Sequence, residues 1–411
     1  MDNSRIAYQP LMMRIFVMLC LPYIGFAQTT LWPAPAKQGW GYIDSSGKLI
    51  VQPRFQSAAY YSDGLSRISV NNLFGFVDSS GNVVIPPQFT FADDFRDGLA
   101  CVRIGSKFGF IDKTGKVVIG ATLGIPTFFS DGFAVVRVIE EPSNLFYLID
   151  KVGRKVPLPF VSNSITDYSD GVAWIETKGP SIAYGVWVAV DAKQHVLFSV
   201  PEEKMCGLAP GDFSEGLAIE GKFCNRKEGF ISKTGQRVID PLYDETFSFS
   251  EGLANVTVNN KTGFIDKEGK QVVAPAFDVA GSFSDGLAVA MIGLPPNPSA
   301  ISGHWIPLLN FGFIDKTGKW MIKPIYTITK EMVPFISCTQ IDTFKDGLAA
   351  LVLPPASHTG DPLFEYIDRS GKVIYGPVPI SATQMILETE QYLQQLGFVN
   401  GCASPSIVPE K

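Results

Sequence analysis

The sequence predicts an all-β fold made of about nine short antiparallel β-meander units. Three observations predict it: a twelve-residue segment recurs along the chain, apolar and polar residues alternate within it, and Gly and Pro occur in every unit. Alternation with a period of two is typical of strands with one buried face, and this density of Gly and Pro would break helices of useful length. We therefore expect a tandem array of small sheets.

The recurring segment is FGFIDKTGKVVI at residues 108–119, with close copies at 74–85 and 311–322. Nine copies align on an apolar residue and the residue after it, at Ile43-Asp44, Val77-Asp78, Ile111-Asp112, Ile149-Asp150, Val190-Asp191, Ile231-Ser232, Ile265-Asp266, Ile314-Asp315 and Ile367-Asp368. A second marker, an acidic residue followed by Gly, accompanies most copies, at positions 63, 97, 131, 170, 215, 251, 285 and 346. The first three copies are 34 residues apart, so the repeat is the unit of the fold.

We predict three strands in each unit, one from a segment of the type GLAxV, one from GFID and one from KVVI. The turn between the last two is explained by its residues: the side chain of Asp112 can accept hydrogen bonds from backbone N–H groups ahead of it, and Gly115 tolerates the left-handed conformation that closes the turn. The repeated Asp is thereby assigned to the turn. A calcium-binding ladder or a catalytic carboxylate pair is the less favoured interpretation.

The unit length bears on how the array is arranged. A propeller blade normally takes four strands and about 40 residues, whereas the units here are 34 residues long and later ones vary in length. We therefore expect an open, solenoid-like arc, with a closed β-propeller-like ring as the alternative.

The N-terminus predicts an export signal over residues 1–27. RIFVMLCLPYIGFA at 14–27 places an Arg before a short apolar run that ends in small residues, and we expect cleavage after Ala27. The run is shorter than the roughly 20 residues of a membrane-spanning helix. The protein is expected in the periplasm, on the cell surface or secreted; lipidation of Cys20 and a start at Met12 or Met13 stay open.

Residues 28–377 are assigned to the repeat array, and 378–411 to a C-terminal helical cap and tail. The helix is predicted from SATQMILETEQYLQQLGFVNG at 381–401, with a Ser at its start, apolar residues at roughly helical spacing and a Gly at its end. It is expected to cap the array, and docking of a partner is the alternative.

Cysteine and histidine usage gives few signals of chemistry. Cys206 and Cys224 form a disulfide in an oxidising compartment or remain free thiols, and the sequence does not distinguish these. The chain has no Cys-x-x-Cys motif or zinc-spaced cluster, so we expect no metal and no cofactor. A formal charge of −6 disfavours a nucleic-acid surface.

The segments WGYIDSSGKLIVQPRFQSAAYYSDGLS at 40–66 and TGFIDKEGKQVVAPAFDVAGSFSDGLA at 262–288 resemble the WG-repeat, or KWG-repeat, family of bacterial proteins. Trp40-Gly41 is the dipeptide that names the family, and most other copies have Phe in place of Trp. The resemblance implies a repeated all-β scaffold that is often exported or associated with the cell envelope. It implies no catalytic residue and no common ligand.

Function is expected where the copies differ. His304 and Trp305, in the insertion 291–310, and His358, in a second irregular segment, are candidate binding-loop residues. His195 stands in a degenerate copy without a catalytic motif, and Trp174 and Trp187 are expected in the core. We predict a non-catalytic scaffold that binds a protein or glycan in the envelope; the alternative is a hydrolase with a site in 180–230 or 291–310.

Overall fold

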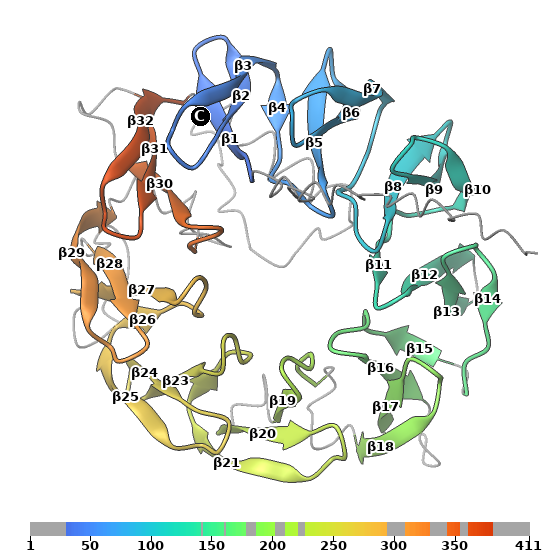
Figure 1. The fold of residues 1–411 in the computed structure, drawn as a ribbon. Helices are drawn as coiled ribbons and strands as arrows, with labels where there is room; N and C mark the ends of the chain where they lie inside the picture. Colours follow the sequence, from blue (N-terminus) through green and yellow to red (C-terminus); the bar gives the residue numbers. More distant parts are fainter. Residues whose placement is uncertain are drawn as a thin grey trace, which may run out of the picture.

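The structure is a computed structural model that describes residues 30–140, 143–159, 162–177, 186–201, 210–220, 227–293, 309–328, 343–353 and 361–380. Over these residues the chain forms nine small antiparallel sheets, which we number in chain order. The sheets follow one another around a ring, with the last strand of each sheet on the outer side (Figure 1). The fold is a nine-bladed β-propeller.

The first four sheets contain β1 (Trp32–Ala36), β2 (Gly39–Ile43) and β3 (Leu49–Phe55); β4 (Ser57–Ala58), β5 (Leu65–Val70), β6 (Leu73–Asp78) and β7 (Val83–Phe89); β8 (Leu99–Ile104), β9 (Lys107–Asp112) and β10 (Val117–Leu123); and β11 (Phe129–Ser130), β12 (Phe133–Glu140), β13 (Ser143–Asp150) and β14 (Lys155–Val156). Sheets 5 and 6 contain β15 (Ser162–Ile165), β16 (Val172–Thr177), β17 (Val186–Asp191) and β18 (Val196–Pro201); and β19 (Leu217–Glu220), β20 (Glu228–Ser232) and β21 (Arg237–Tyr243). Sheets 7 to 9 contain β22 (Glu245–Thr246), β23 (Ala254–Val258), β24 (Lys261–Ile265) and β25 (Gln271–Phe277); β26 (Val279–Ala280), β27 (Leu287–Ile292), β28 (Leu309–Asp315) and β29 (Trp320–Ile328); and β30 (Leu348–Leu353), β31 (Leu363–Asp368) and β32 (Val373–Pro379).

The first and last sheets pack against each other, which closes the ring. The hydroxyl of Tyr366 in sheet 9 donates to the carbonyl of Pro33 in sheet 1 at 3.0 Å, and that of Tyr375 donates to the carbonyl of Pro35 at 2.6 Å. Trp32 is buried in one apolar cluster with residues of both sheets. The open arc favoured from the sequence is therefore not the architecture, and the ring alternative is confirmed.

Two-residue turns allow a 34-residue unit to form a blade. In the turn before β5, Asp63 and Gly64 have φ of 52° and 87°, and Ser62 and Leu65 exchange two backbone hydrogen bonds across them. Positive φ at both central residues characterises the tightest hairpin turns. The three predicted strands are confirmed. In five sheets the segment before this turn adds a fourth, short strand that the sequence analysis missed: β4, β11, β15, β22 and β26.

Variable unit length does not prevent closure, because the longest insertion begins beyond the edge of a sheet. β27 and β28 pair continuously from Leu287 opposite Asp315 to Ile292 opposite Asn310, although 17 positions separate Ile292 from Leu309 in the sequence. The core itself is divided into clusters that each join two neighbouring sheets, including sheets 9 and 1. The apolar interface between neighbours, rather than unit length, holds the ring.

The predicted turn between the middle and outer strands is confirmed. A side-chain oxygen of Asp112 accepts hydrogen bonds from the N–H of Thr114 at 2.9 Å, its hydroxyl at 2.6 Å and the N–H of Lys116 at 3.1 Å, and Gly115 has φ of 85°. These bonds, with that from the Thr114 hydroxyl the largest contribution, hold the pKa of Asp112 below its usual range. The Asp of this repeat is a turn residue.

The Gly of the WG or FG dipeptide has a separate role within each sheet. A Cβ on Gly109 would lie 2.5 Å from the carbonyl oxygen of Ile119, where the register of the outer strand shifts. Gly41, Gly75, Gly229, Gly263 and Gly312 have the same relation to their outer strands. A side chain at this position would push the two strands apart, so these six sheets require glycine here.

The outer strands carry proline along the exposed edge of the ring, at Pro53, Pro86, Pro87, Pro241, Pro275, Pro324 and Pro377. Proline lacks an N–H donor and blocks the pairing of an edge strand with another chain. Within the described ranges no helix is long and apolar enough to cross a membrane. The predicted signal segment, Cys20 and the predicted C-terminal helix lie outside the described residues.

Candidate functional site

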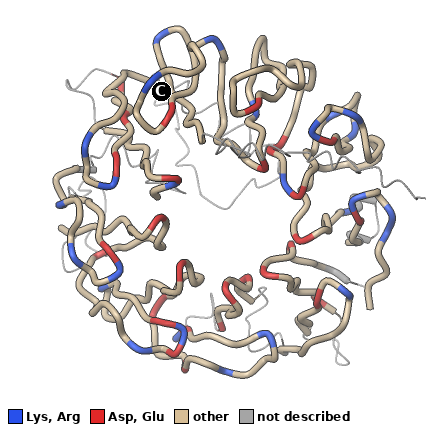
Figure 2. The backbone as a smooth tube through the Cα atoms, in the orientation of Figure 1, with Lys and Arg blue, Asp and Glu red and all other residues tan. Residues whose placement is uncertain are grey.

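Acidic residues lie at the inner ends of the sheets, toward the centre of the ring (Figure 2). They belong to the two-residue turns before the first long strand of sheets 2 to 9. In seven of these turns the carboxylate accepts a hydrogen bond from the Gly N–H of the next turn along the ring, at 2.5 to 3.0 Å. The donor and acceptor pairs are Gly98 and Asp63, Gly132 and Asp97, Gly171 and Asp131, Gly216 and Asp170, Gly252 and Glu215, Gly286 and Glu251, and Gly347 and Asp285. The acidic turns thus form a chain of hydrogen bonds between blades.

A lysine of the next sheet also contacts the carboxylate in several turns. Lys113 lies 2.6 Å from Asp63, and four further pairs are Lys151 with Asp97, Lys233 with Asp170, Lys267 with Glu215, and Lys316 with Glu251. Partial burial of Asp63 acts to raise the pKa of its carboxyl. The hydrogen bonds from Lys113 and Gly98 outweigh this and hold the pKa below its usual range. These carboxylates are paired structural groups.

A serine hydroxyl adds a second link between neighbouring sheets. Ser62 donates to the carbonyl of Phe95 at 2.7 Å, and Ser130, Ser169, Ser214, Ser250 and Ser284 make the same bond to the next sheet. Arg96 and Lys345 replace this serine in sheets 3 and 9. Among the described residues no group of three His, Cys, Asp or Glu side chains could hold a metal ion. The repeated polar residues of the inner turns add hydrogen bonds to the apolar interfaces between neighbouring sheets.

Unrepeated charges occur one position before the buried aromatic residue that precedes each inner turn. Going around the ring from sheet 2, this position is occupied by Tyr60, Asp94, Phe128, Asp167, Asp212, Ser248, Ser282 and Thr343. Sheets 3, 5 and 6 thus have an acid where sheets 7 to 9 have a hydroxyl. Three further charged residues, Arg67, Asp93 and Arg96, interact with these acids. We call the six residues together the inner charged arc: Arg67, Asp93, Asp94, Arg96, Asp167 and Asp212.

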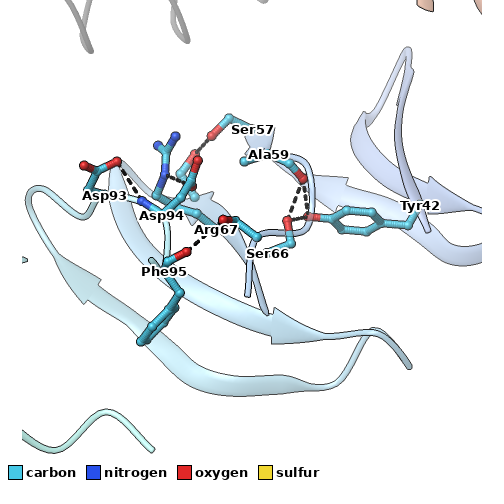
Figure 3. Close-up of polar contacts among 10 residues, drawn as sticks. Tyr42, Ser57, Ala59, Ser66, Arg67, Asp93, Asp94 and Phe95 are labelled. Carbon is cyan, nitrogen blue, oxygen red and sulfur yellow. Dashed lines mark hydrogen bonds and ion pairs between the residues drawn. The ribbon is translucent and has the colours of Figure 1, made fainter. Parts of the chain in front are cut away.

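The arc begins between sheets 2 and 3 (Figure 3). Arg67 of β5 donates from Nε to a carboxylate oxygen of Asp94 at 2.9 Å, and the N–H of Asp94 donates to the carboxylate of Asp93 at 2.8 Å. Asp93 is only 1% exposed. Burial, and then the charge of Asp94, raise the pKa of Asp93, while Arg96 and Arg67 oppose the rise.

The arc continues through sheets 3 to 6. The guanidinium of Arg96 lies over the ring of Phe128, 4.2 Å from its centroid. Burial, and then the charge of Asp212, raise the pKa of Asp167 to about 6, and Arg96 opposes this rise. Asp212 itself is exposed. Neighbouring blades thereby place an exposed acid, a carboxyl that titrates near neutrality and a cation along one side of the ring's inner edge.

The sequence-predicted site residues fall in other places. Cys206, Cys224, His304, Trp305 and His358 lie outside the described residues. In sequence, His304 and Trp305 lie between β27 and β28, and His358 lies between β30 and β31, so the segments that carry them connect strands of the neighbouring sheets 8 and 9.

The remaining His and Trp residues that the sequence drew attention to are in the regular scaffold. His195 is an exposed turn residue whose ring contacts Asp191 at 3.1 Å. Trp174 and Trp187 are buried in the core, as predicted, and Trp174 donates to the carbonyl of Gly211. The inner charged arc was missed, although aligning the residues before each inner turn would have separated its acids from the serines of sheets 7 and 8.

The chain matches the model of a family described as WG containing repeat over residues 40–74, 74–108, 108–138, 229–261, 263–293 and 311–328. The matches leave out the first strands of sheets 1 and 6, β1 and β19, and they leave out most of three sheets: sheets 5 and 9, and sheet 4 beyond residue 138. In these three sheets the middle-strand glycine is replaced by Tyr147, Val188 and Glu365. No curated protein matches the chain.

Solved structures resemble the chain at low sequence identity. A eukaryotic initiation factor is 10% identical, covers 84% of this chain and 95% of its own, and has a TM-score of 0.54. AztD from Citrobacter koseri in its apo form is 11% identical, covers 73% and 93%, and has a TM-score of 0.36. The dihydro-heme d1 dehydrogenase NirN is 11% identical, covers 86% and 74%, and has a TM-score of 0.37. The likeness to the initiation factor concerns the fold alone.

Proposed function

Because the chain belongs to the WG-repeat family and its described sheets close into a ring, we propose that it is a non-catalytic scaffold of the cell envelope that binds a protein partner. The repeated carboxylates support a scaffold, since they are engaged in turns and in bonds between blades. Rings of this kind present side chains from many blades to one ligand, so unrepeated residues are where a partner is recognised.

The observation that carries the proposal is the inner charged arc. Asp94, Asp167 and Asp212 stand where sheets 7 and 8 have Ser248 and Ser282, so an acid is not needed at this position to form a blade. Buried carboxyls with raised pKa values reduce stability at neutral pH and are characteristic of functional sites. A partner with complementary charges would use Asp212 and Arg96 directly.

Affinity capture from envelope extracts tests this binding site. The wild type is compared with an Asp212→Asn, Arg96→Gln double variant and with Glu268→Gln, an exposed hairpin-turn control. We expect a species that is retained by the wild type and the control and is reduced at least about tenfold by the double variant, because each lost charge-assisted contact weakens binding. Equal recovery by all three proteins, or recovery of nothing above background, would refute the arc as the site.

Export is proposed on the predicted signal at residues 1–27. N-terminal sequencing of the protein recovered from its native cells should begin at Gln28. A chain that retains Met1, Met12 or Met13 would contradict export by a cleaved signal.

A second candidate is a hydrolase, because Asp167 has a pKa of about 6 next to Asp212, which lies in the irregular region 180–230. A carboxyl that titrates near neutrality suits general acid catalysis. Hydrolysis of chromogenic ester and glycoside substrates by the wild type, lost in Asp167→Asn, would favour it. Equal rates for both proteins would exclude Asp167 as the acid.

A further inference from the structure

Sheet 9 has a glutamate at a position that is glycine in six other sheets. Those glycines are required because a Cβ would collide with a backbone carbonyl of the outer strand. In sheet 9 the equivalent residue is Glu365, in the middle strand β31. Its side chain therefore needs a local change in the blade.

Gly376 of the outer strand β32 provides that change. It has φ of 92°, and an added Cβ would lie 2.4 Å from the carbonyl oxygen of Phe364 and 3.0 Å from the Cβ of Glu365. The register between β31 and β32 shifts at the same place, between the pairs Phe364 with Val378 and Tyr366 with Tyr375. The glycine has moved from the middle strand to the outer strand, which leaves room for a carboxyl side chain.

Glu365 lies on the side of sheet 9 that faces sheet 8. Phe364 and Tyr366 pack in the cluster shared with sheet 1, whereas Ile367 packs in the cluster shared with sheet 8. Since side chains alternate along a strand, Glu365 is on the same side as Ile367. It is 5% exposed, and it lies two residues from Leu363, where β31 begins.

Tyr326 of β29, in sheet 8, is the aromatic neighbour of Glu365. Tyr326 packs against the apolar cluster that contains Ile367, which lies on the same side of β31 as Glu365. Burial, and then the charge of Glu365, raise the pKa of Tyr326. One face of the Tyr326 ring stacks on Phe311, with centroids 5.2 Å apart and planes at 26°. Tyr326 is itself only partly buried, so this part of the interface between sheets 8 and 9 reaches the surface.

The carboxylate of Glu365 has no hydrogen bond or ion pair with the described residues. The other buried glutamate, Glu228, is 7% exposed and accepts bonds from the N–H of Thr246 at 2.6 Å and from its hydroxyl at 2.9 Å. Burial raises the pKa of Glu365 without compensation. A buried charge that lacks a partner destabilises a fold, and a chain keeps one where it serves binding.

We propose that Glu365 and Tyr326 form a recognition site between sheets 8 and 9 for a positively charged side chain, the guanidinium of an arginine or the ammonium of a lysine, presented by a protein partner. A cation placed beside Tyr326 would make a charge-assisted hydrogen bond to the carboxylate and a favourable contact with the ring. The formal charge of −6 favours the approach of a basic segment. The site is separate from the inner charged arc.

The test measures binding of three acetylated and amidated tripeptides, Gly-Arg-Gly, Gly-Lys-Gly and Gly-citrulline-Gly, to the full chain by calorimetric titration. We expect the two cationic peptides to bind at least about tenfold more tightly than the neutral one, and Glu365→Gln to remove this preference. Tighter binding of the arginine peptide would identify a guanidinium as the ligand, and tighter binding of the lysine peptide an ammonium.

Two controls keep the result interpretable. Glu365→Gln should unfold at a higher temperature than the wild type, because it removes a buried charge that has no partner among the described residues while keeping the shape of the side chain. Glu268→Gln should leave peptide binding unchanged. The proposal is overturned if no peptide binds, if the citrulline peptide binds as tightly as the arginine peptide, or if Glu365→Gln retains the cation preference. Since the capture experiment uses Asp212 and Arg96, either proposal can fail without the other.

Discussion

Sheets 3 and 7 have the same backbone at their inner edge but different side chains. Each has an acidic turn residue that receives the Gly N–H of the next turn, at Asp97 and Glu251. Before this turn sheet 3 carries Asp93, Asp94 and Arg96, whereas sheet 7 carries Phe247, Ser248 and Ser250. The comparison shows that blade formation depends on a few turn and core residues, so the remaining inner positions are free to acquire a function.

The largest effect is expected where the two sheets are alike. Gly109→Ala in sheet 3 and Gly263→Ala in sheet 7 each place a Cβ about 2.5 Å from a carbonyl of the outer strand. Both should lower the free energy of unfolding by about 1–3 kcal/mol, the range of substitutions whose added atoms force the backbone to shift. Denaturant unfolding measures this, and Gly120→Ala, where nothing lies within 4 Å, is the control. A loss in only one sheet would show that the shared backbone is not what matters.

Titration of Asp167 should separate sheet 5 from the serine-bearing sheets. Its folded-state pKa of about 6 lies above the unfolded value of about 3.9, so the folded chain binds more protons between these values. Stability therefore falls as the pH rises from about 4 to about 6. Asp167→Asn should raise the free energy of unfolding by about 1–2 kcal/mol at pH 7.5 and have little effect near pH 4. An equal effect at both pH values would contradict the assignment.

Arg67 and Asn255 occupy equivalent positions in sheets 2 and 7. Arg67→Met removes the guanidinium that pairs with Asp94 at 2.9 Å and should cost about 1–2 kcal/mol at neutral pH, with a further rise in the pKa of Asp93. Asn255→Leu loses one bond to the carbonyl of Ala280 but also removes a buried, unpaired carbonyl oxygen, so its effect should be near zero. Thermal unfolding of both variants measures the contrast; similar losses would mean that the charges of sheet 3 do not matter.

The smallest effect is expected for the lysines over the inner turns. Lys316 lies 3.2 Å from Glu251 and both side chains are partly exposed, so Lys316→Met should cost at most about 1 kcal/mol. The loss should shrink at high salt, since counterions screen exposed pairs. Unfolding in low and high salt tests this. A large loss that salt does not change would indicate that the turn network depends on its lysines.

Much of the fold was predictable because its signals are local. Asp112 and Gly115 specify their turn within four residues, and the alternation of FGFID and KVVI specifies two strands. The acidic residue and Gly located the inner turns correctly. The hydrogen bonds between the inner turns of neighbouring sheets were not predicted, because the partner of Asp63 is the N–H of Gly98, 35 residues away. The burial of Glu365 without a partner among the described residues was likewise hidden, since room for its side chain depends on Gly376, 11 positions further on.

The sequence by itself determined the nine units, the three longer strands of each and the chemistry of the turn between the middle and outer strands, because these depend on residues within one repeat. Only the tertiary structure decided that the array closes. Closure depends on the rotation between successive sheets, which their buried interfaces set and which no single repeat reveals. The contact of Tyr366 with Pro33, 333 residues apart, is the result of that accumulated rotation. The same packing brings together the charges of the inner arc and leaves Glu365 buried between two blades.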